Sequence, residues 1–175
     1  MAITATALLL SLTSCSSSDD EQIVDELANL SKFQEITNTT HTIELYAPSG
    51  SLEQGYNEIS IRIKDNATGS YVKNAEVSWS PLMHMTMMTH SCPKSEVAKV
   101  TTNGTLYEGY IVFQMAQNAT EYWDLQIDYS IDGTSYTTTA VIDVPASIQR
   151  RVNTVTGSDG SKYIVAYAEP NHPKV

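Results

Sequence analysis

The chain has little cysteine and little charge, and its N-terminal hydrophobic run is short. Of its 175 residues, two are cysteines and 17% are charged, with 20 acidic residues against 10 basic ones and a net charge of −10. An acidic protein lacks the lysine and arginine surface that binds phosphates, so we expect no nucleic-acid partner. The apolar run at Ala2–Leu12 is too short to cross a bilayer as a stable helix.

The sequence also lacks the short motifs of the common enzyme classes. It contains no G-x-S-x-G, no H-E-x-x-H, no C-x-x-C and no glycine-rich phosphate loop. A histidine and a cysteine lie close together at His90 and Cys92, but no third residue can be assigned to orient them. We therefore expect that the protein is not an enzyme.

The N-terminus resembles the signal peptide of a bacterial lipoprotein. The apolar run ends in Leu12-Thr13-Ser14-Cys15, which is similar to a lipobox, where the cysteine thiol is lipidated before the preceding segment is removed. Residues 1–15 are therefore interpreted as a signal peptide, with Cys15 as the lipidation site. The serine and acid run Ser16–Glu21 resembles that of Bacteroidetes lipoproteins, in which it favours export to the cell surface. These features predict an outer-membrane lipoprotein of the cell envelope, with a lipid anchor in the membrane, that faces the periplasm or the cell surface.

Residues 16–40 are expected to form an acidic and polar tether. The Ser16–Glu21 run cannot bury an apolar surface and stays solvated. Within Ile23–Phe33, apolar residues recur with a weak helical period. We interpret that segment as one short helix or a partly ordered linker.

From residue 41 onward the hydrophobic pattern is that of short strands. In Tyr56–Lys64, for example, three isoleucines share one face and charged residues share the other. Turn signals such as Asp132-Gly133 separate the strands at intervals of roughly 8–12 residues. The expected strands are Thr42–Ala47, Tyr56–Lys64, Ala75–Trp79, Val97–Thr101, Glu108–Met115, Tyr122–Ile131, Ser135–Val144, Gln149–Thr156 and Ser161–Ala168.

This pattern predicts an all-β fold, namely an antiparallel immunoglobulin-like or cupredoxin-like β-sandwich of about seven to nine strands. No helices alternate with the strands, so a parallel α/β sheet is not expected. We expect the sandwich to cover residues 41–148. Residues 149–175 are expected to add one hairpin and a linker that leads to a second domain outside this chain.

The most unusual stretch of the sequence is Pro81–Pro93, which reads PLMHMTMMTHSCP. It holds four of the six methionines, two of the four histidines and one of the two cysteines. Thioether, imidazole and thiol groups suit Cu(I), whereas thioethers do not select calcium or magnesium and bind zinc poorly. The segment therefore predicts a copper site in which Cu(I) is favoured and Cu(II) is reachable through the histidines.

Two interpretations of this segment stay open on the sequence alone. If the segment is extended, alternate residues share a face, so that one face carries four ligand-type side chains and the other carries three methionines. The methionine face is also what the buried side of a strand looks like, since methionine is a flexible core filler. The first face comprises His84, Met88, His90 and Cys92, and the second comprises Met83, Met85 and Met87.

Cys92 carries alternatives of its own. If Cys15 is lipidated, Cys92 is the only thiol left and no internal disulfide can form. A lone thiol in an oxidising compartment is a metal ligand, an intermolecular pairing site or a buried and inert side chain. The neighbouring Met88 and His90 keep the first of these alternatives open.

A set of spaced motifs resembles the YtkA-like domains. Their pattern is P-x-M, then M-x-x-M-x-H, then a strand that ends in Phe-x-Met, and finally a Trp. The chain follows it over roughly residues 42–144, with Thr89 and Ala116 where the family has glycines and with an additional Cys92-Pro93. The matching residues are Pro81, Met83, Met85, Met88, His90, Tyr110, Phe113, Met115 and Trp123.

This resemblance implies a small immunoglobulin-like sandwich, related in name to the FixH group that is linked to the assembly of copper-containing respiratory oxidases. It implies copper ligands at Met85, Met88 and His90, with Met115 approaching from a neighbouring strand. We expect an envelope lipoprotein that binds copper as a chaperone, buffer or assembly factor, and whose partner is a copper-receiving or other envelope protein. With the residues that the alternation selects, the expected metal ligands are His84, Met85, Met88, His90, Cys92 and Met115.

The alternative is a non-catalytic immunoglobulin-like interaction module whose methionines only pack in the core. It would bury the methionine side chains and point the two imidazoles apart. Ten tyrosines and an acidic composition would suit a protein or glycan partner at the cell envelope.

Overall fold

Strands make up the regular structure of the chain where it is described. The computed structural model describes residues 25–149 and 151–168, and these residues contain eleven strands and no helix. Each pair of neighbouring strands is antiparallel. The strands form a five-stranded, a four-stranded and a two-stranded sheet.

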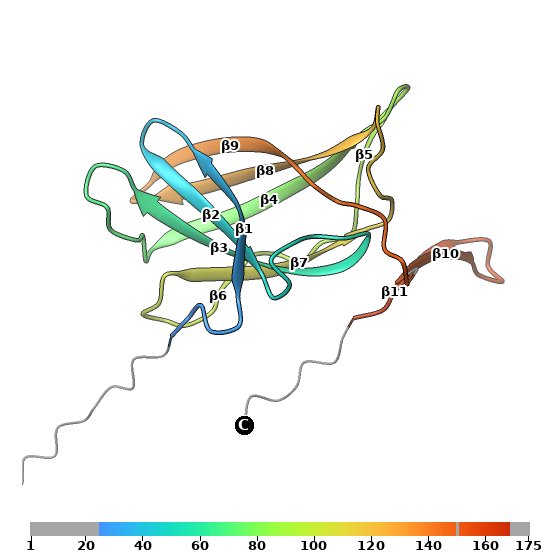
Figure 1. The fold of residues 1–175 in the computed structure, drawn as a ribbon, viewed down its shortest axis with the longest axis horizontal. Helices are drawn as coiled ribbons and strands as arrows, with labels where there is room; N and C mark the ends of the chain where they lie inside the picture. The colour runs from blue at the N-terminus through green and yellow to red at the C-terminus, as the bar shows by residue number, and fades with distance from the viewer. Residues whose placement is uncertain (1–24, 150, 169–175) are drawn as a thin grey trace, which may run out of the picture.

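The two larger sheets face each other as the layers of a sandwich (Figure 1). The five-stranded sheet has the order β1 (Ser31–Thr37), β2 (His41–Ala47), β3 (Gly55–Asp65), β7 (Leu106–Phe113) and β6 (Ala98–Lys99). The four-stranded sheet has the order β5 (Thr89–Ser91), β4 (Ala75–His84), β8 (Tyr122–Ile131) and β9 (Thr134–Ile142). A separate hairpin consists of β10 (Val152–Thr156) and β11 (Lys162–Ala166).

The connectivity is that of an immunoglobulin-like sandwich. Strands β2, β3, β7 and β6 are neighbours in one sheet, in the order of the strands called A, B, E and D in that fold. Strands β4, β8 and β9 are neighbours in the other sheet, as C, F and G are, while β1 and β5 extend one edge of each sheet. The predicted antiparallel all-β sandwich is confirmed, with five and four strands in its layers and the hairpin in addition.

Alternating apolar residues build the core between the layers. Ile59, Ile61 and Ile63 on β3 are fully buried, and they face Trp79 and Trp123 of the other sheet in one contiguous cluster. Burying a side chain of this kind contributes about 1.5–3 kcal/mol to folding. The face of β3 that the sequence pattern selects is therefore the core face.

A tight turn joins β8 to β9. Its residues Asp132 and Gly133 both have positive φ, of 49° and 80°, which is typical of a two-residue type I′ turn. The turn fixes the register of the hairpin, so that Trp123 pairs with Ile142 at the far end. The Asp-Gly signal in the sequence therefore sets which side chains of β8 face the core.

The first strand lies where the sequence indicates a tether. Residues 31–37, which fall within the expected tether of residues 16–40, form β1 and pair with β2, and Ile36 is buried opposite Ile43. Residues 25–30 form turns, with no helix. The short helix or partly ordered linker expected over Ile23–Phe33 is thus, where described, a turn and the start of a strand, because pairing with β2 satisfies the backbone and overrides a weak local preference.

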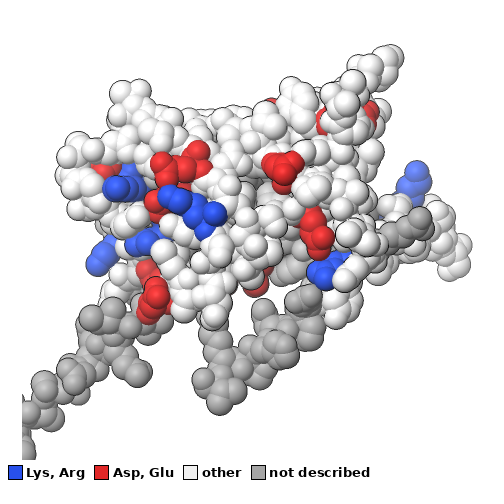
Figure 2. Space-filling view, in the orientation of Figure 1, with Lys and Arg blue, Asp and Glu red and all other residues white. Residues whose placement is uncertain are grey.

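Charges are sparse and mixed on the visible surface. Basic and acidic residues lie next to one another in Figure 2, mainly at the end of the sandwich where β2 begins and β3 ends, and most of that face is uncharged. In the described part of the chain, no helix has the length and hydrophobicity needed to span a bilayer. The proposed signal peptide and Cys15 lie outside the described residues.

Candidate functional site

The Met/His segment folds into a hairpin at one end of the sandwich. Pro81–His84 completes β4, a turn follows at residues 85–88, and β5 runs back beside β4. The N–H of Met85 donates a hydrogen bond to the carbonyl of Met88 at 2.9 Å and closes the turn. Met87 and Met88 are 91% and 62% exposed, whereas Met83 is fully buried. The segment is therefore divided between the core and the tip of a turn.

Pairing within this hairpin decides which side chains share a face. Met83 and His90 are paired across β4 and β5, so both side chains lie on the inner face of the sheet. His84 follows Met83 directly and lies on the outer face. The turn of residues 85–88 holds an even number of residues and reverses the alternation, which a continuous extended segment would have kept. This register removes His84 from the predicted common face of His84, Met88, His90 and Cys92, whereas His90 and the buried Cys92 remain on the inner side.

His84 has a separate environment on the outer face. Its Nε2 lies 2.7 Å from Oδ2 of Asp124, which is an ion-pair distance when the imidazole is protonated, although the angle is not that of a hydrogen bond. The imidazole also stacks on the ring of Tyr122, with 4.8 Å between ring centroids and 12° between planes. His84 is therefore held by β8 on the opposite side of the sheet from His90.

His90 is oriented in a way that suits a metal ligand. Its Nδ1 lies 2.9 Å from the carbonyl oxygen of Ser91, and a carbonyl can only accept a hydrogen bond, so Nδ1 carries the proton. The other ring nitrogen, Nε2, then presents a lone pair. Metal-binding histidines commonly have this arrangement, in which a backbone carbonyl fixes the tautomer and the ring. The edge-on contact with Trp123, at 5.7 Å between centroids, holds the ring in place.

Two methionines lie at the same end of the core as His90. The indole N–H of Trp123 donates a hydrogen bond to the carbonyl of Met115 at 2.9 Å. The same indole contacts the imidazole of His90, so both residues lie beside Trp123. Met85 follows the end of β4 on the inner side, and the side chains of Met85 and Met115 are half-buried against the core. Met88 sits nearby in the turn with most of its surface exposed. The four residues that the family resemblance selects therefore lie around one end of the sandwich.

Cys92 is part of the hydrophobic core. Burial raises the pKa of its thiol to about 12, and the charge of Lys94 offsets this only in part. At neutral pH the side chain is a thiol, whereas the thiolate is the metal-binding and nucleophilic form. Of the alternatives for this residue, the structure favours the buried and inert one.

A metal site in this region would depend on the thioethers. Within residues 25–149 and 151–168, no three side chains of the types His, Cys, Asp and Glu come close enough to share a metal ion. A site made of one imidazole and several thioethers suits Cu(I) and suits zinc, calcium or magnesium poorly. The donor set at Met85, Met88, His90 and Met115 thus fits copper better than the commoner metals.

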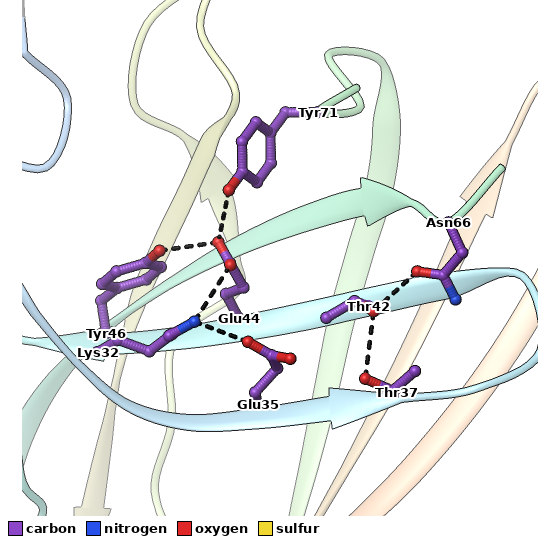
Figure 3. Close-up of polar contacts among 8 residues, drawn as sticks. All are labelled: Lys32, Glu35, Thr37, Thr42, Glu44, Tyr46, Asn66 and Tyr71. Atoms are coloured by element: carbon purple, nitrogen blue, oxygen red, sulfur yellow. Dashed lines mark hydrogen bonds and ion pairs between the residues drawn. The ribbon is translucent and has the colours of Figure 1, made fainter. Parts of the chain in front are cut away.

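A second polar cluster, which the sequence pattern does not indicate, lies on the outer face of the five-stranded sheet (Figure 3). Glu44 is 6% exposed and accepts hydrogen bonds from the hydroxyls of Tyr46 at 2.8 Å and Tyr71 at 3.1 Å. The ammonium of Lys32 lies 3.3 Å from the other carboxylate oxygen and 2.6 Å from Glu35. The partners of Glu44 come from β1, β2 and the segment before β4, so the cluster links these three parts of the chain.

The electrostatics of this cluster follow from its burial. Burial by itself raises the pKa of Glu44, but the hydrogen bonds from Tyr46 and Tyr71 and the charge of Lys32 outweigh it, so the pKa lies below its usual value. Burial and the bond to Glu44 raise the pKa of Tyr46 to about 12. The carboxylate is therefore ionised and the phenol is neutral at neutral pH. No motif signals the whole cluster, because Tyr71 and the residues of β1 and β2 come together only through strand pairing and folding.

Comparison with known proteins adds no family assignment. No protein-family model matches the chain, and no curated protein matches it significantly. The resemblance to the YtkA-like domains accordingly rests on the short motifs alone.

Proposed function

We propose that the protein is an envelope-anchored lipoprotein that binds Cu(I) through Met85, Met88, His90 and Met115, and that it acts as a copper chaperone, buffer or assembly factor. The observation that carries the proposal is the orientation of His90. Its Nδ1 is engaged by a backbone carbonyl and its Nε2 is left as a donor atom. The same indole contacts the imidazole of His90 and binds the backbone of Met115.

The exposure of the four residues suits a site that receives and releases a metal. Met85 and Met115 are half-buried and supply thioethers from two different segments of the chain. Met88 is 62% exposed at the tip of the turn and would be the first donor that an incoming ion meets. Soft thioethers with a neutral imidazole stabilise Cu(I) and select against harder cations.

The anchoring and the partner are proposed from the N-terminal sequence. Lipidation of Cys15 would place the sandwich at the outer membrane, on the periplasmic or the external side, with residues 16–30 as the tether. The partner would be an envelope protein that receives the copper ion. Residues 1–24 lie outside the described part of the chain.

An anaerobic Cu(I) titration against a competing chromophoric chelator tests the proposal. The protein carries Cys15→Ser to prevent lipidation and Trp79→Phe, so that Trp123 is the only tryptophan. We expect one equivalent of Cu(I) to bind with a dissociation constant well below about 1 μM and to quench the fluorescence of Trp123. His90→Ala and the volume-conserving Met115→Leu should each weaken binding at least about tenfold.

The matched controls are His84→Ala, which removes the predicted ligand on the opposite face of the sheet, and Cys92→Ala, which removes a buried thiol that stays protonated at neutral pH. They should leave the Cu(I) affinity unchanged. If Cu(I) binds no more tightly than micromolar, the copper function is wrong. If His84→Ala weakens binding as much as His90→Ala does, the proposed ligand set is wrong.

A second candidate function is a non-catalytic interaction module. It is favoured by the two imidazoles, which lie on opposite faces of the four-stranded sheet. The exposed Met87 and Met88 contradict its expectation that the methionines only pack in the core, and they would instead form part of a contact surface, since flexible methionines adapt to partner surfaces. If the folded protein does not bind Cu(I), the interaction module is favoured over the copper function.

A further inference from the structure

A hollow on the outer face of the five-stranded sheet lies apart from the methionine hairpin. Its volume is about 290 Å³, and β3, β7, β6 and the segment before β6 line it. The residues that form it and that the argument uses are Tyr56, Glu58, Glu96, Glu108 and Tyr110. A hollow of this size accepts one side chain or a small organic group, because sites for drug-sized ligands are about 300–1,000 Å³.

Two tyrosine rings form the aromatic part of the hollow. Tyr56 of β3 and Tyr110 of β7 lie 5.2 Å apart between ring centroids, tilted by 31°. Tyr110 is 39% exposed, so part of its side chain is accessible to a ligand. An aromatic face attracts a cation through the ring quadrupole, by about 0.5–2 kcal/mol.

Carboxylates surround these rings. Glu58 of β3 lies opposite Tyr110 of β7 in the strand register. Glu96 and Glu108 are exposed and form no ion pair within the described residues. The one lysine of the lining, Lys99, donates to the carbonyl of Thr102 at 2.7 Å. The lining of the hollow therefore combines aromatic rings with the exposed carboxylates of Glu96 and Glu108, and its carboxylates outnumber its one ammonium group.

The wall of the hollow is fixed before any ligand binds. Ser95 exchanges two hydrogen bonds with the backbone of Tyr110, of 2.9 and 2.8 Å, and its carbonyl accepts the indole N–H of Trp79 at 3.0 Å. Gly109 allows this close approach, because a Cβ at that position would lie 2.6 Å from Ser95 Oγ and 2.8 Å from the carbonyl oxygen of Glu96. A backbone wall that is already ordered reduces the entropy lost on binding.

We propose that this hollow binds the guanidinium group of an arginine in a basic segment of a partner protein. Guanidinium is planar and stacks on the accessible ring of Tyr110, while its N–H fork donates to the neighbouring carboxylates. A neutral sugar would use the rings but would leave the charges of Glu96 and Glu108 without a partner. The complementarity of charge therefore selects a cationic side chain over a glycan.

The test uses the full-length protein with Cys15→Ser and a five-residue peptide, acetyl-Ser-Gly-Arg-Gly-Ser-amide. The matched control peptide carries citrulline, which has the shape of arginine without its charge. Amide shifts in two-dimensional NMR should change around Gly109 and Tyr110 with a dissociation constant of about 1 mM for the arginine peptide. The citrulline peptide should cause no saturable shift, and higher salt should weaken binding of the arginine peptide.

Variants locate the site. Tyr110→Ala and the Glu96→Gln/Glu108→Gln double variant should each weaken binding at least fivefold, and Tyr110→Phe should retain it. Tyr122→Ala, which removes an equally exposed tyrosine (41% against 39%) from the other sheet, should leave it unchanged. The shift pattern of each free variant reports whether it is folded.

Three outcomes would overturn the proposal. Equal binding of the citrulline peptide would remove the role of charge. Shifts at Tyr110 with a neutral oligosaccharide, and none with the arginine peptide, would make the hollow a glycan site. No shift with either ligand, in a protein that is folded, would mean that the hollow is not a binding site. None of these results depends on whether the protein binds copper.

Discussion

At the scale of single residues, burial and partners decide what each polar side chain does. His84 and His90 are six positions apart and chemically identical, yet one faces Asp124 on the outer surface and the other faces Trp123 on the core side. Cys92 loses its reactivity because burial keeps it protonated. Glu44 stays ionised because three donors compensate for its burial.

Substitution of Glu44 tests this balance through the pH dependence of stability. The pKa of Glu44 is lowered in the folded state, so its stabilisation is present above the unfolded-state pKa of about 4.5 and is lost as the pH falls through the lower folded-state value. We expect Glu44→Gln to reduce the free energy of unfolding by about 1–3 kcal/mol at pH 7. The difference from wild type should shrink as the pH falls below about 4.5 in urea unfolding measured by tryptophan fluorescence.

Glu35→Gln is the matched control for this experiment. Glu35 also contacts Lys32, at 2.6 Å, but its side chain is 45% exposed. Exposed ion pairs contribute little, so the expected loss is below about 1 kcal/mol. A Glu44→Gln variant as stable as wild type, or a difference that grows in acid, would contradict the account of the cluster.

At the scale of elements, turns and close approaches set the geometry of the two proposed sites. The turn of residues 85–88 sends His90 to the inner face, and the contact of Ser95 and Glu96 with β7 forms the wall of the tyrosine hollow. A change in either place should act through backbone geometry, without any change in the side chains that would bind a ligand.

Gly109→Ala should disturb the wall of the hollow. The new Cβ would lie 2.7 Å from Trp79 Cζ2 and 2.6 Å from Ser95 Oγ, closer than real side chains pack. We expect a loss of about 1–3 kcal/mol in the free energy of unfolding and shifted amide resonances at Ser95 and Glu96. Denaturant unfolding and two-dimensional NMR measure both effects.

Gly69→Ala separates this crowding from backbone strain. Gly69 has a φ of 72°, and no atom lies within 4 Å of the position of a Cβ, so alanine there has only the conformational cost of about 1 kcal/mol. It should leave the resonances of Ser95 and Glu96 in place. If Gly109→Ala has the midpoint of wild type and unchanged spectra, the proposed contact does not constrain the wall.

At the scale of the whole molecule, the described residues form a packed sandwich and a separate hairpin. β10 and β11 pair with each other and with no strand of the two larger sheets. Large side chains on the hairpin are exposed, including Val155, Tyr163 and Val165. A two-stranded hairpin without a packed face is marginally stable in water.

Hydrogen exchange should therefore divide the molecule into two classes. Backbone amides of β3 and β8, which lie in the interior of their sheets, should exchange only by global unfolding. Amides of β10 and β11 should exchange at least about a hundredfold faster than those of β3 and β8. Amides of the edge strand β1 should exchange at an intermediate rate. Equal protection in β10 and β3, measured by NMR after transfer to D2O, would show that the hairpin is part of the cooperative unit.

The fold could be predicted because its signals are local. The isoleucines of β3 alternate, and Asp132-Gly133 adopts the turn that its residue types favour. The strand at Ser31–Thr37 could not be predicted in this way, because its stability depends on pairing with β2. The sequence could not show that His84 and His90 lie on opposite faces of the sheet. That outcome depends on the length of the turn at residues 85–88, and the composition of Pro81–Pro93 does not mark where a turn begins or ends.

The sequence by itself determined an antiparallel all-β sandwich and concentrated the thioether and imidazole groups in one short segment. The alternation of apolar residues and the residue types of turns are local properties of the chain, so they predict strands and turns without knowledge of the tertiary structure. Only the tertiary structure decided that His84 leaves the methionine cluster, that Cys92 is a core thiol, and that Tyr56 and Tyr110 meet. These outcomes depend on register between strands distant in sequence, and register is fixed by the packing of the whole core.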